Sequence, residues 1–454
     1  MHARLVLGAA VVAVVACQGT GYFVCSEDAE CAAAAGAGVC QPTGACSFPD
    51  DGCTSGQRYG SESPPELAGE CVALDEGSTS MSGGSGSEEE ATGSTTTAVD
   101  STGPIDPSGD DCPPDWWDCA WAHRQPLTLT RPIAAPLDDV PVLILITEGR
   151  VAHELMQADG EDVRFVSAQG TNLPHEVERW EPQGISTIWV RVDELGGASD
   201  HLWIYYGNPS AEGADVPQGA WSDPFVGVWH LEEDPTDSTP NANDASTSGT
   251  VGVTHGQIAN GMNFGSSTAR LDVGATPSVA DVFATGGTIT AWIRPRGWGG
   301  GNFGRIANKD AAGSGWSFNV GGGGQLRFGF VPNAATGAVI WGTPNGALET
   351  HRWAHVAVTY APLNVEAPLL YVNGVLQELG MAPEPPMVAE PSSDAEIPLA
   401  LGNRANNDRR FDGILDEIRI QTVVRDPEWI EVQAESERDE LLIYGAIESW
   451  EVGG

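Results

Sequence analysis

Asp416 and Glu417 are the first candidates for chemistry, because they lie side by side in the apolar run Phe411–Ile420. A strand places alternate side chains on opposite faces, so this spacing puts Asp416 on one face with Ile418 and Glu417 on the other with Leu415. A carboxylate in a row of isoleucines is costly to bury unless it is hydrogen-bonded, paired or bound to a metal. We therefore expect a central strand in which Asp416 is held by a specific partner.

The spacing of these acids argues against glycoside hydrolysis. That reaction generally needs two carboxylates that face one cleft about 5–9.5 Å apart, and a strand supplies such a pair only from residues two positions apart. The residues two positions from Asp416 are isoleucines. His153-Glu154 begins like a zinc-protease helix, but Gln157 stands where the second histidine is needed. We predict that the protein is not an enzyme.

Trp298 and Trp341 are the aromatic residues whose surroundings suit a sugar site. Trp298 lies in the glycine-rich segment 296–303 and Trp341 directly precedes Gly342, whereas several of the other tryptophans lie inside apolar strand patterns. Aromatic side chains in loops at one end of a β-sandwich can form a platform for a carbohydrate ring. The alternative is that both rings pack over the end of the sandwich. We take Trp298 and Trp341 as candidate ligand-binding residues.

The elements that must position these residues are short strands. Apolar or alternating runs of strand length recur along the chain, separated by turn residues, and helical periods are few. The clearest runs are 140–146, 188–192, 202–206, 288–293 and 325–330. The pattern predicts an all-β protein with two strand-rich domains, at about residues 115–210 and 221–450.

Several segments of the second region resemble laminin-G-like domains, the jelly-roll sandwiches related to concanavalin A-type lectins and glucanases. They are FVGVWHL at 225–231, WAHVAVTY at 353–360, LYVNGV at 370–375, the run 411–420 and the short helical segment DPEWIE at 426–431. The resemblance spans roughly residues 221–447. It implies a concanavalin A-like jelly roll, which is a fold that hosts many functions and by itself specifies none.

Laminin-G-like relatives often hold a calcium ion between an early loop and the acidic residue of the closing strand. The segment Asp237–Asp244 (DSTPNAND) resembles that loop and offers the oxygen ligands that calcium prefers. The resemblance implies Asp237, Asn243 and Asp416 as ligands of a structural Ca²⁺, which would also resolve the burial of Asp416. The alternative is that Asp416 accepts hydrogen bonds from backbone N–H groups and Asp237 shapes a turn.

Residues 115–210 resemble a bacterial domain of unknown function that commonly precedes laminin-G-like domains in secreted proteins. The motifs that carry the resemblance are WAHR at 121–124, DGEDVRF at 159–165, LPHE at 173–176, WVR at 189–191 and YYGN at 205–208. The resemblance implies a β-sandwich. It implies no activity, because none is attached to the family.

The amino terminus predicts an export signal over residues 1–16. Arg4 precedes the apolar run Leu5–Val15, which is too short to span a bilayer. The run ends at VVAC, whose Cys17 resembles the acylated first residue of bacterial lipoproteins. An ordinary signal peptide followed by a structural cysteine is the alternative. We expect an exported protein that a lipid on Cys17 anchors to the bacterial cell envelope, at the outer membrane or the cell surface.

Eight of the 9 cysteines remain when Cys17 is set aside, an even number that suits disulfides in an oxidising compartment. Six lie in a cysteine-rich module at 17–72, which has too few large apolar residues for a core and lacks the spacing of a zinc site. The other two lie near the start of the first sandwich. Residues 73–114, which follow the module, are rich in Ser, Thr, Gly and acidic residues, and this composition predicts a disordered linker. The expected disulfide cysteines are Cys25, Cys31, Cys40, Cys46, Cys53, Cys71, Cys112 and Cys119.

The net charge of −42, from 21 basic and 63 acidic residues, argues against nucleic acid and anionic membrane surfaces as partners. Membrane contact is expected through the lipid anchor only. We expect a non-catalytic binding protein that presents a lectin-like module to carbohydrate or to a surface protein. Two alternatives stay open: a structural envelope component without a sugar site, and a divergent glycoside hydrolase whose carboxylates come from loops.

Overall fold

The computed structural model describes short stretches of the N-terminal part of the chain and most of the chain after residue 111. The described residues are 32–33, 36–37, 39–41, 46–49, 57–59, 72 and 112–450 without 198–199, 215–216, 312, 363–366 and 384–390. The chain divides into two compact units, Met1–Ser101 and Thr102–Gly454. Among the described residues, no helix is both long enough and apolar enough to cross a membrane.

The described residues of the first unit form five short strands, of which three make a small antiparallel sheet in the order β3-β4-β5. The strands are β1 (Ala32–Ala33), β2 (Gly36–Ala37), β3 (Val39–Cys40), β4 (Cys46–Pro49) and β5 (Gln57–Tyr59). The backbones of Cys40 and Cys46 are directly paired across β3 and β4. The predicted signal peptide, Cys17, Cys25, Cys31, Cys53, Cys71 and most of the predicted linker lie outside the described residues.

The first sandwich of the second unit has a three-stranded sheet that faces a six-stranded sheet. The smaller sheet has the order β10 (His175–Arg179), β11 (Ser186–Leu195), β7 (Leu137–Ile146). The larger has the order β28 (Leu442–Tyr444), β6 (His123–Leu129), β12 (His201–Tyr206), β8 (Arg164–Ser167), β9 (Asn172–Leu173), with β29 (Glu448–Ser449) also paired to β6. Leucine, isoleucine and valine from these strands fill the space between the sheets. Cys112 and Cys119 form the expected disulfide at the entry to this sandwich.

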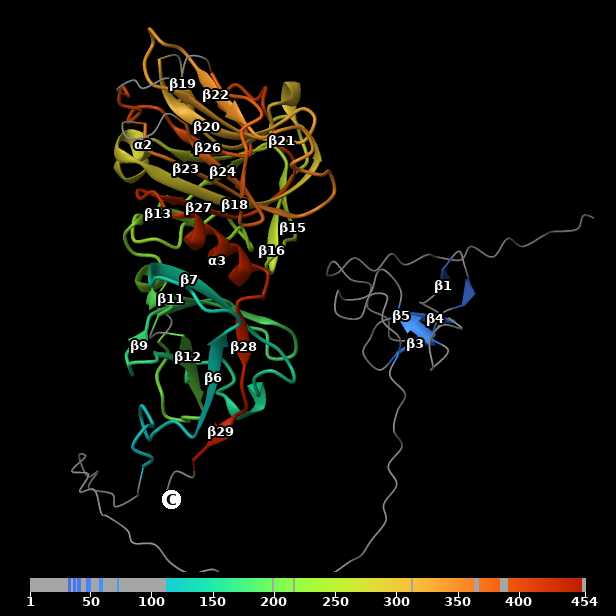
Figure 1. The fold of residues 1–454 in the computed structure, drawn as a ribbon, viewed down its shortest axis with the longest axis vertical. Coiled ribbons are helices and arrows are strands. Elements are labelled where there is room, and N and C mark those ends of the chain that lie inside the picture. The colour runs from blue at the N-terminus through green and yellow to red at the C-terminus, as the bar shows by residue number, and fades with distance from the viewer. Residues whose placement is uncertain are drawn as a thin grey trace, which may run out of the picture. The chain divides into compact units, whose positions relative to one another are not determined.

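The chain returns to the first sandwich at its C-terminal end. β28 and β29 both pair with β6, although they follow the second sandwich in sequence (Figure 1). The predicted boundary, which assigned residues up to 450 to the jelly roll, is therefore wrong for 442–449. The sequence hid this because a strand of two or three residues carries too little alternation to show which sheet it joins.

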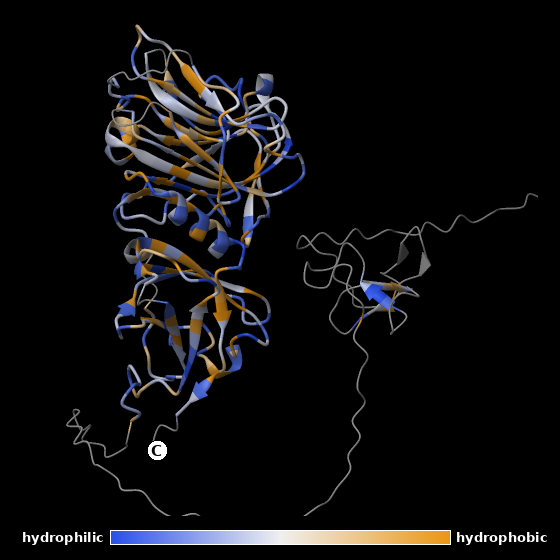
Figure 2. Cartoon of the chain, viewed as in Figure 1, coloured by the Kyte–Doolittle hydropathy of each residue, from blue (hydrophilic) through white to orange (hydrophobic). Residues whose placement is uncertain are grey.

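The second sandwich is the predicted concanavalin A-like jelly roll, built from an eight-stranded and a seven-stranded antiparallel sheet. The inner sheet has the order β15 (Val251–His255), β16 (Asn260–Phe264), β27 (Asp412–Gln421), β18 (Gly287–Gly297), β23 (Ala354–Tyr360), β24 (Leu369–Val372), β25 (Val375–Gln377), with β13 (Phe225–Trp229) paired to β27. The outer sheet has the order β14 (Ser246–Ser248), β17 (Arg270–Gly274), β26 (Leu399–Leu401), β19 (Arg305–Ala311), β20 (Ser314–Gly321), β21 (Gln325–Val331), β22 (Val339–Gly342). Aromatic and branched side chains fill the core between the two sheets, and Figure 2 shows hydrophobic residues along the strands of both sandwiches.

A β-bulge in β27 overturns the predicted alternation around Asp416. Asp416 pairs with Trp292 and Arg419 with Thr290, so two residues of β27 lie opposite one residue of β18. The extra residue is Glu417, which has a left-handed φ of 48°. The side chains therefore change faces at the bulge: Leu415, Ile418 and Ile420 all enter the sandwich core, whereas Asp416, Glu417 and Arg419 face away from it.

Helix α3 (Pro427–Glu437) covers the outward face of the inner sheet and separates it from the first sandwich (Figure 1). Trp429, Ile430 and Val432 of α3 belong to the core of the first sandwich. On the other side, Gln433 and Glu437 bond to Thr290 and Trp292 of β18. Because α3 is buried from both sides, the two sandwiches share a continuous interior rather than meeting as independent domains.

Asp426 caps α3 and provides a test of how much this helix contributes to stability. Its carboxylate accepts the backbone N–H of Trp429 at 2.9 Å, and Pro427 occupies the first helical position. Asp426→Ala should lower the free energy of unfolding by about 1 kcal/mol in urea titrations. Asp426→Asn keeps an acceptor in the same place and should lose much less; an equal loss in both variants would contradict the capping role.

Candidate functional site

A cluster of charged side chains is buried where the two sandwiches meet. We call it the junction cluster and define it by its members: Glu176, Glu178, His230, Asp416, Glu417, Arg419 and Glu437. The first two belong to β10 of the first sandwich, and the others follow β13 or belong to β27 and α3. Five carboxylates thus surround two basic groups. None of these side chains is more than 9% exposed.

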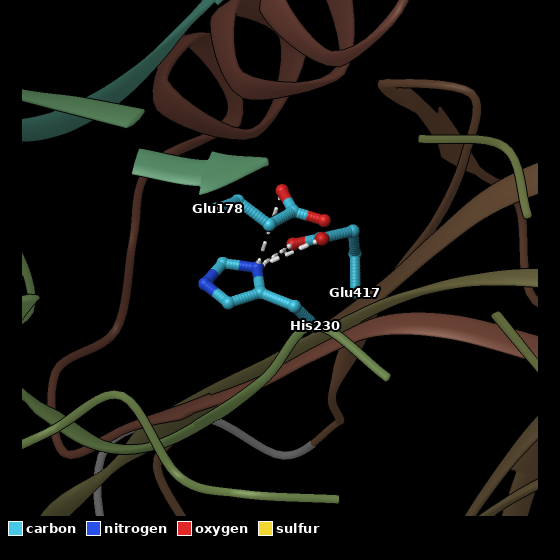
Figure 3. Close-up of side chains that lie close together, drawn as sticks. All are labelled: Glu178, His230 and Glu417. Carbon is cyan, nitrogen blue, oxygen red and sulfur yellow. Dashed lines mark hydrogen bonds and ion pairs between the residues drawn. The ribbon is translucent and has the colours of Figure 1, made fainter. Parts of the chain in front are cut away.

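His230 connects the two sandwiches through both ring nitrogens, and Figure 3 shows the contacts of one of them with Glu178 and Glu417. Its Nε2 lies 3.0 Å from Glu176 Oε2, and its Nδ1 lies 2.8 Å from Glu417 Oε1 and 3.8 Å from Glu178 Oε2. The ring also stacks near Trp189, with 5.9 Å between ring centroids. His230 is thus a buried histidine whose partners are carboxylates, two from the first sandwich and one from its own.

Arg419 is fully buried, and both terminal nitrogens of its guanidinium donate to carboxylates, whereas its Nε has no hydrogen-bond partner among the described residues. It donates to Glu417 Oε2 at 2.6 Å and to Glu437 Oε1. Its guanidinium lies 4.2 Å from the ring centroid of Trp189 and 4.8 Å from that of Trp221. The planar guanidinium suits this place because it can donate hydrogen bonds in its plane and also contact neighbouring aromatic rings.

The excess of carboxylates shifts the pKa values in the junction cluster. Burial, reinforced by the charge of Glu417, raises the pKa of Glu178 to about 8. Burial and Glu417 also raise the pKa of Asp416 well above its ordinary value. Burial alone would lower the pKa of His230, but Glu417, Glu176 and Glu178 raise it well above the usual range.

Asp416 is held by backbone donors. Its Oδ2 accepts the N–H groups of Gln257 and Ile258 at 2.8 and 3.0 Å, and its Oδ1 is buried without a hydrogen-bond partner among the described residues. The expectation of a central strand and a specific partner for Asp416 is confirmed. The partner is the turn between β15 and β16, whose backbone N–H groups bond to Asp416, as expected if no calcium ion holds this residue.

Asp237 and Asn243 lie together in the loop after β13, where protein donors already occupy their oxygens. Asp237 accepts the N–H groups of Val228, Thr239 and Asn243 and the Thr239 hydroxyl, at 2.8 to 3.0 Å. Asn243 Oδ1 accepts two further hydroxyl groups. Asp416 shares no hydrogen-bond partner with this loop among the described residues. These three residues as arranged do not fit a shared calcium ion, and calcium stays a prediction.

Trp341 is not a loop residue, and its predicted place at a loop edge is wrong. It lies in β22, is 1% exposed and packs against Tyr360 with 5.5 Å between ring centroids. Trp298 is half-buried in the glycine-rich loop, where it packs against the sandwich core. A glycine after a tryptophan can mark the end of a strand as well as a loop, and Gly342 is the last residue of β22. The pattern therefore gave the wrong position for Trp341.

A polar row crosses the outward face of the outer sheet near Trp298. Trp316, Phe318 and Val320 of β20 point into the core, so Asn319 points outward. It pairs directly with Arg305 on β19 and Arg327 on β21. We call Arg305, Asn319 and Arg327 the polar row.

The polar row carries incompletely compensated groups. Asn319 Oδ1 is buried without a hydrogen-bond partner among the described residues. Burial lowers the pKa of Arg305 to about 10 and also lowers the pKa of Arg327. Arg327 and Arg409 lie 4.8 and 5.4 Å from the centre of the Phe303 ring, and neither forms an ion pair with a described carboxylate. The row therefore has positive charge to offer a ligand.

Sequence reasoning missed both Glu178 and the polar row. The motif LPHE at 173–176 pointed to β10, but nothing local indicates that Glu176 and Glu178 meet His230 from another sandwich. Asn319 and Arg327 are isolated polar residues in strand patterns, and such residues usually face solvent without a role.

Comparisons with known families agree with this fold. Residues 268–431 match the model described as "Concanavalin A-like lectin/glucanases superfamily", and residues 159–221 match "Domain of unknown function (DUF2341)". The chain thus carries a concanavalin A-like domain preceded by a domain of unknown function, as both resemblances implied. No curated protein matches the chain.

Solved structures share the fold only distantly. The binding domain of Paraclostridial Mosquitocidal Protein 1 is 17% identical with a TM-score of 0.38, over 47% of this chain and 52% of that chain. The receptor binding domain of botulinum neurotoxin C/D mosaic serotype is 15% identical with a TM-score of 0.36, over 47% of this chain and 51% of that chain. The chain spans about half the length of these structures, and the likeness is too remote to bear on function.

His355 provides a pH test of the layer beside the junction cluster. Burial lowers its pKa to about 3, from an ordinary value of 6.5, and its ring packs on Trp292 with 5.6 Å between centroids. The unfolded chain therefore binds a proton that the folded chain excludes, so stability falls as the pH drops from 6.5 toward 3. In that window, the free energy of unfolding of His355→Phe, measured in urea titrations, should fall by about 1.4 kcal/mol less per pH unit than that of the wild type.

The internal control for this pH test is the range above about pH 8, where His355 is neutral in both the folded and the unfolded chain. There the free energies of unfolding of His355→Phe and the wild type should differ by a constant amount. If the difference also stays constant below pH 6.5, folding does not lower the pKa of His355.

Proposed function

We propose that this chain is a non-catalytic binding protein of the bacterial cell envelope whose concanavalin A-like sandwich binds carbohydrate that carries acidic groups. The observation that supports this most directly is the polar row, in which the unpartnered oxygen of Asn319 lies between Arg305 and Arg327. A carboxylate or sulfate of the ligand can accept charge-assisted hydrogen bonds from Arg327 and Arg409, which are half-buried beside Phe303. The family match to lectins and glucanases is consistent with a saccharide ligand.

The overall charge of the protein does not prevent an acidic ligand from binding. The chain carries a net charge of −42, which repels anions at a distance. At physiological salt that repulsion is screened within about 8 Å. Contact with the half-buried Arg327 and Arg409 is screened much less, so the local attraction decides binding.

The absence of catalysis is supported by the acids on the same face. In the described strands of the outer sheet, the outward-facing carboxylates are Asp272 and Asp310. Asp272 pairs with Arg270 at 2.5 Å, and Asp310 lies 3.5 Å from Arg305. Glycoside hydrolysis needs one carboxylate as an acid and one as a base or nucleophile. Both carboxylates of this face are engaged by arginine side chains and are not free to take those two roles. Because of the bulge in β27, Asp416 and Glu417 face the same side, but both are buried between the sandwiches.

Arg327→Gln tests the proposed ligand site. On an array of neutral and acidic polysaccharides, the full chain should bind acidic members, and the variant should bind them about 10- to 100-fold more weakly because it loses charge-assisted hydrogen bonds. Arg352→Gln is the control, since Arg352 is 78% exposed and lies outside the row. Equal binding of neutral and acidic glycans would refute the role of charge.

Trp298→Ala separates the proposed lectin from a purely structural envelope component. Trp298 lies beside the turn Gly321–Gly324 at the end of the row. Loss of binding in this variant, with an unchanged melting temperature, would place its ring at the ligand. If the wild type binds no glycan at all, the structural alternative or a protein partner is favoured, and measurable sugar release would revive a hydrolase.

Lipid anchoring at Cys17 is part of the proposal and needs its own experiment. Cys17→Ser should move the exported protein from the membrane fraction to the soluble fraction and abolish incorporation of labelled palmitate, because the thiol that accepts the lipid is gone. Cys25→Ser is the matched control and should stay with the membrane. Membrane association that survives Cys17→Ser would refute the lipid anchor.

A further inference from the structure

Three side chains of the junction cluster converge on one point between the sandwiches. Glu178 Oε2, His230 Nδ1 and Glu417 Oε1 all lie within 4.8 Å of one another (Figure 3). The three side chains are 2%, 8% and 0% exposed, although the backbone of Glu178 is more open. One ligand atom comes from the first sandwich and two come from the second.

One oxygen at this point has no protein partner. Glu178 Oε1 is buried and accepts no hydrogen bond from any described residue. A buried carboxylate oxygen without a donor costs free energy, and a second carboxylate beside it raises that cost. A cation in front of Glu178 and Glu417 would remove both penalties. It would also offset the negative charge of the cluster, in which the described basic groups His230 and Arg419 face five carboxylates.

Each of the three side chains is also oriented from behind. His230 Nε2 lies 3.0 Å from Glu176 Oε2, which can accept the Nε2 proton, so that a metal ion could displace the proton of Nδ1 on the side of Glu178 and Glu417. Trp189 Nε1 donates to Glu178 Oε2 at 2.7 Å, and Arg419 donates to Glu417 Oε2 at 2.6 Å. In protein metal sites, the histidine ligands commonly hydrogen-bond to a carboxylate through their other nitrogen, and the carboxylate ligands accept hydrogen bonds from neighbouring donors.

We propose that Glu178, His230 and Glu417 bind a divalent transition-metal ion that fastens the two sandwiches to each other. One imidazole nitrogen and two carboxylate oxygens form a donor set that suits Zn²⁺ and its neighbours rather than calcium, which prefers oxygen alone. The ion takes the place of the proton that otherwise lies between His230 and Glu417. Its role is structural, because its ligands are buried between two packed sandwiches.

Zinc itself is the probe for this site. The full chain is stripped with chelator and titrated with Zn²⁺ in a calorimeter, and its melting temperature is followed in parallel. We expect the wild type to bind one zinc ion per chain and its melting temperature to rise with zinc. Glu178→Gln should abolish both the binding and the rise. The glutamine keeps an acceptor for Trp189, so the variant should fold. Glu161→Gln, an exposed glutamate of the same sandwich, is the control and should keep the ion.

Cobalt gives the second readout. Co²⁺ in a site with nitrogen and oxygen ligands absorbs visible light, and both Glu178→Gln and Glu417→Gln should lose that absorption. Zinc that binds equally to the wild type and to these variants belongs to other residues and overturns the proposal. The proposal is also overturned if the stripped wild type binds no zinc, since the cluster is then an ion-pair network with a protonated His230.

Discussion

Arg419 is the residue on which the joint between the two sandwiches depends. It is fully buried, and its guanidinium compensates Glu417 and Glu437 while contacting the adjacent rings of Trp189 and Trp221. Removing one partner of a buried ion pair leaves the other uncompensated, which costs far more than an exposed pair is worth. Because Arg419 and Glu417 belong to β27, Glu437 to α3 and Trp189 to β11, this one side chain fixes the relative placement of both sandwiches.

The bulge at Glu417 makes that arrangement possible. A regular strand would have sent Glu417 into the core of the jelly roll with Leu415 or sent Ile418 out of it. The left-handed conformation of Glu417 turns its side chain to the same face as Asp416. Ile418 and Ile420 therefore still fill the core, and three charged side chains of the strand face away from it. Bulges often re-aim side chains at functional places in this way.

The two candidate sites have different physical characters. The junction cluster is rich in buried carboxylates and therefore attracts protons or a cation, whereas the polar row is rich in arginine and attracts anions. Both lie on the concanavalin A-like sandwich, one on the outward face of each sheet. The return of β28 and β29 to the first sandwich means that the concanavalin A-like sandwich and the domain of unknown function form one compact unit.

The sequence by itself determined the all-β class, the jelly roll and the strand that holds Asp416, because apolar period and ordered motifs are local properties that survive in any tertiary setting. It also determined the short helix after β27 and the disulfide between Cys112 and Cys119. Only the tertiary structure decided which face Glu417 occupies, because one residue in a left-handed conformation reverses the alternation without changing the composition. It likewise decided that Trp341 is buried and that Glu178 meets His230, since those contacts join residues that are tens of positions apart and depend on how two sandwiches pack.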